Sequence, residues 1–310
     1  MPLHPQAQAL CDLVNTTREP VAPQDRVEQT RLGWGLLLAM AGGPSEPMFA
    51  VDDRDADGVP VRVYRPSPEV DRPVLVVFHG GGWVIGNVEQ FDVIARQLAR
   101  VSGAVVVSVD YRLSPEHRYP IPLDDCWRAL EWTAAHAAEL GADASRIAVG
   151  GDSAGANLAA VCAVRARDHG GPALALQMLV YPVCDCRFDT ESYVTNGEGF
   201  LLEAEQMQWF FDCYTGGDAD PADRHISPLR TPDLGGVAPA VVITAEYDPL
   251  RDEGEAYVQR LRTAGVPVEH RRYDGMIHGF FGLSGALDAS RDALDYVGTA
   301  LRRAFGTLDA

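Results

Sequence analysis

One serine stands where the surrounding residues favour a nucleophile. Ser153 lies in the segment GDSAG at residues 151–155, which follows the apolar run 147–149 and precedes small residues typical of a helix. This G-x-S-x-G pattern, placed between a strand and a helix, is typical of a sharp turn that raises the serine hydroxyl above a sheet. Glycines two residues before and after the serine let the two backbones approach closely. The alternative interpretation is a glycine-rich helix start that contains a serine by chance. A base and an acid at suitable positions in the sequence would favour the nucleophile over this alternative.

A serine hydroxyl becomes a strong nucleophile when a base takes its proton and a third group orients that base. In folds that contain this turn, the acid and then the histidine follow the serine along the chain, each after a strand. Asp248 follows the predicted strand 240–244, and His278 follows the predicted strand 268–273. The order Ser153, Asp248, His278 therefore predicts a catalytic triad.

Other acidic and imidazole side chains are the alternatives to this assignment. Glu246 and Asp252 lie close to Asp248, and Asp252 fits better at a helix N-terminus, where the dipole favours negative charge. Six histidines lack a position after a suitable strand and are interpreted as surface or structural residues: His4, His117, His136, His169, His225 and His270.

A glycine-rich segment is a candidate for stabilising negative charge. The sequence HGGGW at residues 79–83 directly follows the apolar run 74–78. Consecutive glycines let backbone N–H groups turn toward a developing oxyanion, in a geometry that residues with a Cβ resist. An ordinary glycine turn is the alternative. His79 precedes the nucleophile in the chain, so we interpret it as structural.

The elements that position these residues alternate between strands and helices. This pattern predicts an α/β fold with a mostly parallel sheet and helices on both faces. The predicted strands are 49–51, 59–64, 74–78, 104–109, 147–149, 174–180, 240–244 and 268–273. The predicted helices are 6–14, 27–40, 91–101, 123–140, 203–214, 252–263 and 287–305, with one more after Ser153.

The alternation breaks twice, and both breaks predict additions to the core. Residues 1–45 are predicted to be an N-terminal helical segment, and residues 183–237, with a loop at 193–200, an inserted segment. The core is then divided into residues 46–182 and 238–310.

Composition excludes some partners. The net charge of −18 argues against nucleic acid or an anionic membrane, because both require a basic face. No apolar run reaches 18 residues, and the first residues lack the features of a signal peptide, so a cytoplasmic location is expected. The six cysteines are scattered without a zinc-binding spacing and are interpreted as free thiols.

Taken together, five motifs resemble the hormone-sensitive-lipase family of α/β-hydrolases, and most of all its bacterial carboxylesterases, often called family IV. They are HGGGW at 79–83, DYRLSPE at 110–116, GDSAG at 151–155, DPL at 248–250 and HGF at 278–280. The resemblance runs from about residue 45 to the C-terminus and places the chain in the larger, GDSAG type. Ser114 stands where alanine is usual, which puts no catalytic residue in doubt.

The resemblance implies a serine carboxylesterase of the α/β-hydrolase fold, with a helical cap formed by residues 1–45 and 183–237. It implies ester hydrolysis through an acyl-enzyme, with no metal and no cofactor. A compact cap carrying bulky side chains favours short- to medium-chain acyl esters over long triglycerides. A homodimer through the sheet edge near the last strand is a further expectation. The implied site residues are the triad Ser153, Asp248 and His278 and the oxyanion-hole amides of Gly81, Gly82 and Ala154, with Gly80 serving the turn.

The substrate is less well defined by the sequence. Trp83, Met207 and Phe211 are predicted to line the pocket, with packing inside the cap as the alternative for the last two. Hydrolysis of lactones, carbamates or arylformamides, or a lyase reaction, would use the same site. A hormone receptor without turnover, like the plant gibberellin receptors, is a further alternative, and the intact His278 opposes it.

Overall fold

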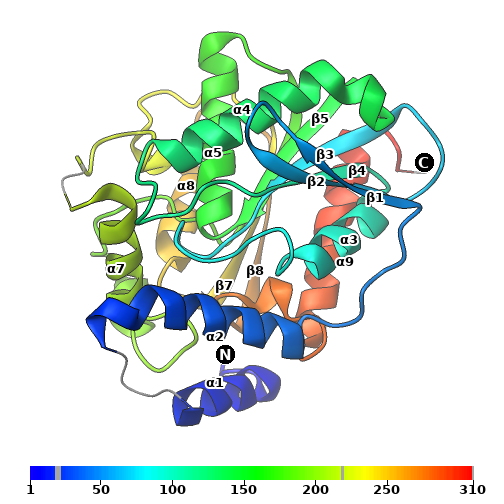
Figure 1. Ribbon diagram of the computed structural model, residues 1–310. Coiled ribbons are helices and arrows are strands. Elements are labelled where there is room, and N and C mark those ends of the chain that lie inside the picture. The colour runs from blue at the N-terminus through cyan, green and yellow to red at the C-terminus, as the bar shows by residue number, and fades with distance from the viewer. Residues whose placement is uncertain (18–21, 218–219, 309–310) are drawn as a thin grey trace.

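The computed structural model describes residues 1–17, 22–217 and 220–308. These residues form a mixed eight-stranded sheet with helices on both faces (Figure 1). The strand order is β1-β2-β4-β3-β5-β6-β7-β8. Residues 18–21 and 218–219, which belong to the predicted cap segments, and residues 309–310 of the predicted core lie outside the described residues.

The elements follow the alternation that the sequence predicts. The strands are β1 Ala50–Asp55, β2 Pro60–Arg65, β3 Arg72–Phe78, β4 Val105–Val109, β5 Ala142–Asp152, β6 Leu174–Val180, β7 Ala240–Tyr247 and β8 Val268–Ile277. The α-helices are α1 Pro5–Thr17, α2 Arg26–Ala41, α3 Asp92–Ser102, α4 Ile121–His136, α5 Ala154–His169, α6 Glu191–Thr195, α7 Ala204–Thr215, α8 Arg251–Thr263 and α9 Asp288–Ala304.

An antiparallel hairpin begins the sheet, and a parallel set of strands follows it. β1 and β2 are joined through Asp57 and Gly58, whose φ angles of 54° and 89° suit the tight turn that connects twisted strands. β2 also pairs antiparallel with β4, whereas each neighbouring pair from β4 to β8 is parallel. The carboxyl ends of β3, β5, β7 and β8 therefore share one edge of the sheet.

The central strands are apolar on both sides because each face is covered by helices. Val74, Val76 and Phe78 of β3 belong to one buried cluster, which includes residues of α4, α5 and α8. Leu75 and Val77 belong to a second cluster, which includes residues of α3 and α9. Alternate side chains of one strand thus supply two separate cores, as the two-residue repeat of a strand requires.

One predicted segment differs from the structure, and several strands are longer than expected. The predicted loop 193–200 contains the end of α6, a single helical turn held by tertiary contacts. The N–H of Ser192 donates to the Asp252 carboxylate (2.8 Å), and its hydroxyl donates to the Pro249 carbonyl (2.6 Å). β5, β7 and β8 extend beyond their apolar runs because strand pairing continues through polar residues.

No helix within the described ranges 1–17, 22–217 and 220–308 combines the length and apolarity needed to span a bilayer.

Two glycines in helices provide a matched test of packing. A Cβ built on Gly298 of α9 would lie 2.7 Å from Cβ of Val101, whereas one on Gly33 of α2 meets nothing within 4 Å. We expect Gly298→Ala to lower the free energy of unfolding by about 1–3 kcal/mol through overpacking. Gly33→Ala should raise it by up to about 1 kcal/mol, since alanine favours helix. Denaturant unfolding measures both, and equal effects of the two substitutions would contradict this account of the α3–α9 contact.

Candidate active site

Ser153 lies in a strained turn between β5 and α5. Its φ of 55° and ψ of −118° are rarely adopted by residues other than glycine. The turn is held by a hydrogen bond from the Ser153 N–H to the Val180 carbonyl (2.8 Å). A Cβ on either Gly151 or Gly155 would collide with the Phe78 carbonyl oxygen. The predicted close approach of the backbones, and the need for both glycines, are therefore confirmed.

Ser153, His278 and Asp248 meet at the carboxyl edge of the sheet. His278 Nε2 lies 3.0 Å from Ser153 Oγ, and His278 Nδ1 lies 2.7 Å from Asp248 Oδ2. Both are hydrogen-bond distances, so the imidazole can accept the serine proton and the carboxylate can orient the imidazole. Asp248 is fully buried, and its second oxygen accepts the N–H of Leu250 (2.8 Å). The arrangement can deprotonate the serine and keep one tautomer of the imidazole.

The two alternative acids have other partners. Glu246 accepts the N–H of Gly275 (2.7 Å), and Asp252 accepts the N–H of Ser192 (2.8 Å). Both carboxylates therefore serve the backbone around the site, and the carboxylate that contacts the imidazole is that of Asp248.

The glycine segment after β3 forms a tight turn beside Ser153. The carbonyl of Gly81 accepts the N–H groups of Val84 (3.0 Å) and Ile85 (2.9 Å), which closes the turn. Gly81 and Gly82 have φ angles of 113° and 57°, which side chains disfavour. The N–H of Gly80 donates to Asp152 Oδ1 (2.9 Å), so this turn is tied to the residue just before the nucleophile.

His79 is a structural part of the same turn. Its ring is buried and stacks on Tyr111 with a centroid distance of 4.2 Å, while Nδ1 lies 2.8 Å from the Gly80 carbonyl oxygen. Burial lowers the pKa of His79, so the ring is neutral and its Nδ1–H donates to Gly80. The Tyr111 hydroxyl donates to the His79 carbonyl (2.7 Å). The segment at 110–116 thus supports the glycine turn.

This geometry agrees with comparisons to known proteins. A family model described as an alpha/beta hydrolase fold matches residues 75–282, more than half of the chain. The chain belongs to the hormone-sensitive-lipase-like family of α/β hydrolases.

Several esterases are similar to this protein over most of its length. Carboxylesterase NlhH of Mycobacterium tuberculosis (strain ATCC 25618 / H37Rv) is 44% identical over 83% of this chain and 84% of its own length. An ethyl acetate hydrolase of Pseudomonas putida is 34% identical over 98% of this chain and 99% of its length. The crystal structure of a thermostable esterase from Pseudomonas putida ECU1011 superimposes with a TM-score of 0.93 at 36% identity, covering 100% of this chain and 98% of that one.

Two residues of the hydrolase site were missed by sequence reasoning. Asp152 lies inside the motif, so its position beside the serine was a signal for a role in the turn. The ring of Tyr181 lies 4.5 Å from that of His278, and Tyr181 has a φ of 34°. No sequence pattern indicates Tyr181, because its contact depends on how β6 and β8 end relative to each other.

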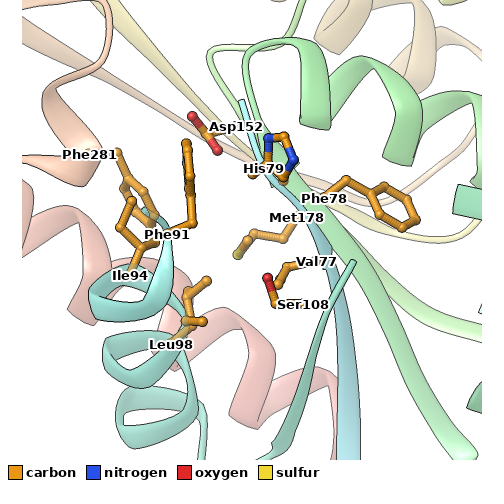
Figure 2. A pocket seen from close by; sticks show the side chains of 12 residues that line it. Val77, Phe78, His79, Phe91, Ile94, Leu98, Ser108, Asp152, Met178 and Phe281 are labelled. Carbon is orange, nitrogen blue, oxygen red and sulfur yellow. The ribbon is translucent and has the colours of Figure 1, made fainter. Parts of the chain in front are cut away.

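A small cavity lies below the turn that carries Ser153, between α3 and the sheet. Its volume is about 20 Å³, which is room for about one water molecule and far too small for an ester. Figure 2 shows His79, Asp152 and Ser108 among largely apolar side chains that line it. This cavity is therefore a packing feature under the nucleophile.

The three residues predicted to line the substrate pocket are all buried. Trp83 stacks on Tyr214 with a centroid distance of 4.3 Å, and Phe211 meets Trp83 edge-on at 6.3 Å. Met207 is buried in the same cluster. Packing accounts for their burial in this structure, and their contact with substrate stays a prediction.

Asp152 makes the stability of the protein depend on pH. Burial raises the pKa of this carboxyl from 3.8 to about 6. The folded protein thus resists an ionisation that the unfolded chain undergoes freely, so stability falls as pH rises from about 4 to about 6. Asp152→Asn keeps an acceptor for the Gly80 N–H and cannot ionise. Above pH 6 we expect this variant to exceed the wild type in free energy of unfolding by on the order of 2–3 kcal/mol, with no difference below pH 4.

Asp143 is the control with the opposite sign. Hydrogen bonds from Ser145 and Arg146 lower the pKa of this half-buried carboxyl to about 2. Its contribution to stability is present above pH 4 and is lost as pH falls through its folded pKa, so Asp143→Asn should destabilise the protein at pH 7. Denaturant unfolding between pH 3 and 8 measures both variants. Destabilisation by Asp152→Asn at pH 7 would contradict our interpretation of the buried carboxyl.

Proposed function

We propose that this protein is a serine carboxylesterase that hydrolyses short- to medium-chain acyl esters. The observation that carries the proposal is the continuous contact from Ser153 Oγ through His278 to Asp248, with distances of 3.0 and 2.7 Å. The relatives named carboxylesterase and ethyl acetate hydrolase, which match over most of the chain, support the same reaction.

In the proposed mechanism, His278 takes the Ser153 proton as Oγ attacks the ester carbonyl carbon. The carbonyl oxygen becomes negatively charged, and the N–H groups of Gly81, Gly82 and Ala154 donate hydrogen bonds to it. Each such donor contributes about 10²- to 10³-fold to the rate in comparable enzymes, because the donors are already oriented before the charge develops. The strained turn of Ser153 and the two positive φ angles support this arrangement.

The second half of the reaction uses the same residues. His278 gives its proton to the leaving alcohol, and the acyl group stays on Ser153. Water then enters where the alcohol was and attacks the acyl carbon as His278 takes one of its protons. When the bond from the acyl carbon to Ser153 Oγ breaks, His278 returns this proton to Oγ and the acid is released. Asp248 holds Nδ1 of His278 protonated and stabilises the imidazolium. No step requires a metal or a cofactor.

We propose that residues 1–45 and 183–237 form a cap over a core made of residues 46–182 and 238–310. Two contacts between the cap segments support this division: the Arg26 guanidinium lies 4.5 Å from the centroid of the Trp209 ring, and the Asn15 side chain donates to the Gly199 carbonyl (3.2 Å). In Figure 1, α1, α2 and α7 gather on one side of the molecule.

The preference for short chains follows from the filled interior of this cap. The proposed pocket-lining residues, Trp83 of the core and Met207 and Phe211 of the cap, are buried in one cluster in which Trp83 contacts the rings of Phe211 and Tyr214. This dense packing supports a pocket with little length for an acyl chain. The cytoplasmic location and the homodimer stay predictions.

Hydrolysis of p-nitrophenyl esters from two to sixteen carbons tests the function. We expect the wild-type rate to peak at short chains and Ser153→Ala to lower kcat by roughly 10⁴- to 10⁶-fold, as for other triad nucleophiles. Ser145→Ala, at an exposed serine earlier in β5, is the control and should retain full activity.

Each contrary result has a distinct meaning. Faster turnover of the sixteen-carbon ester than of the four-carbon ester would overturn the proposed chain length. Turnover of lactones or amides alone would reassign the bond. Binding without turnover of any acyl compound would favour a receptor.

A further inference from the structure

We propose that Trp34, on α2, sets the upper size of the alcohol group that the site accepts. The inference deepens the esterase function proposed above and rests on it. It concerns a residue of the N-terminal segment that is remote in sequence from the catalytic motifs.

Trp34 and Leu201 converge on the backbone beside the catalytic base. A methyl group built on Gly279, the residue after His278, would lie 3.3 Å from Cη2 of Trp34 and 3.2 Å from a methyl of Leu201. These distances mean that both side chains pack directly on the Gly279 backbone. Two segments far apart in the sequence therefore form one wall next to the imidazole.

The leaving alcohol must lie on the His278 side of the site. Nε2 of His278 transfers its proton to the alcohol oxygen, so this oxygen must come within hydrogen-bond distance of the imidazole. The carbon atoms attached to that oxygen then extend past His278, where Trp34 and Leu201 pack. Tyr181 occupies another side of the imidazole, with a centroid distance of 4.5 Å.

Phe210 borders the opposite side of the site, next to the proposed oxyanion hole. The ring of Phe210 packs so closely on Gly82 that any Cβ there would collide with it. Gly82 belongs to the proposed oxyanion hole, so Phe210 borders the carbonyl side, whereas Trp34 borders the alcohol side.

Trp34 is held firmly enough to act as a wall. One turn earlier on α2, Arg31 Nε donates to the Val84 carbonyl (2.9 Å), and its two terminal nitrogens contact both Glu116 oxygens at 2.8 Å. Gly35 lets the helix approach Gln90, since a Cβ there would meet its side-chain amide. The indole N–H of Trp34 is buried without a hydrogen-bond partner among the described residues, so packing alone positions the ring.

The test varies the alcohol while the acyl group stays constant. Ethyl, n-butyl and cyclohexyl acetates are compared for the wild type, Trp34→Phe and Trp34→Ala by continuous titration of the released acid. We expect Trp34→Ala to raise the ratio of kcat/KM for cyclohexyl over ethyl acetate by about tenfold or more, a typical effect of opening space in an apolar pocket. Trp34→Phe should lie between the two. The acyl-chain profile on p-nitrophenyl esters should stay within twofold of the wild type.

Two further variants separate this role from a structural one. Leu201→Ala should shift the alcohol ratio in the same direction, and it supplies the test if Trp34→Ala fails to fold. Trp209→Ala, which removes a half-buried indole that packs on Arg26, should leave the ratio unchanged.

An unchanged alcohol ratio in folded Trp34→Ala, or an equal shift in acyl-chain preference, would overturn the inference. Absence of any ester hydrolysis by the wild type would instead overturn the proposed function, and the inference with it.

Discussion

The arrangement of the site depends on how closely the nucleophile turn approaches the end of β3. Gly151 and Gly155 leave no room for a Cβ against the Phe78 carbonyl, so β5, α5 and β3 meet at backbone distance. This contact places Ser153 beside the glycine turn that follows Phe78. Because the strands are parallel, the ends of β7 and β8 reach the same edge and supply the acid and the base. One steric constraint thus brings the nucleophile and the glycine turn together, and strand direction adds the other residues.

Buried polar contacts then hold the turns that carry the site. Asp152 accepts the N–H of Gly80, the Tyr111 hydroxyl donates to the His79 carbonyl, and the ring of His79 stacks on Tyr111. Such groups are costly to bury unless they are paired, so each contact favours one backbone conformation. The burial that lets Asp152 accept the Gly80 N–H also disfavours its ionised form, which is why its pKa is raised. Strain and unfavourable burial are therefore concentrated next to Ser153, where orientation matters most.

Most of the fold, and the identity and order of Ser153, Asp248 and His278, could be predicted from local patterns. Apolar runs predicted the central strands because strands covered on both faces must be apolar. Chain order and position after a strand indicated Asp248, with Glu246 and Asp252 as nearby alternatives, and the contact of Asp248 with His278 Nδ1 decides among them. The turn of helix at 191–195 was missed because contacts with Asp252 and Pro249 hold it, and neither is visible in its own residues. The extra lengths of β5, β7 and β8 were missed because partner strands extend pairing beyond the apolar run.

The sequence by itself determined the alternation of elements, the glycines at the turns and the order of the nucleophile, acid and base, since each depends on neighbouring residues or on chain direction. Only the tertiary structure decided which side chains surround the base. Tyr181, against His278, and Trp34 and Leu201, against Gly279, come from three separate segments, and their positions depend on how those segments pack on the core. Contacts of this kind depend on the positions of whole elements in space, and a local residue pattern carries no information about those positions.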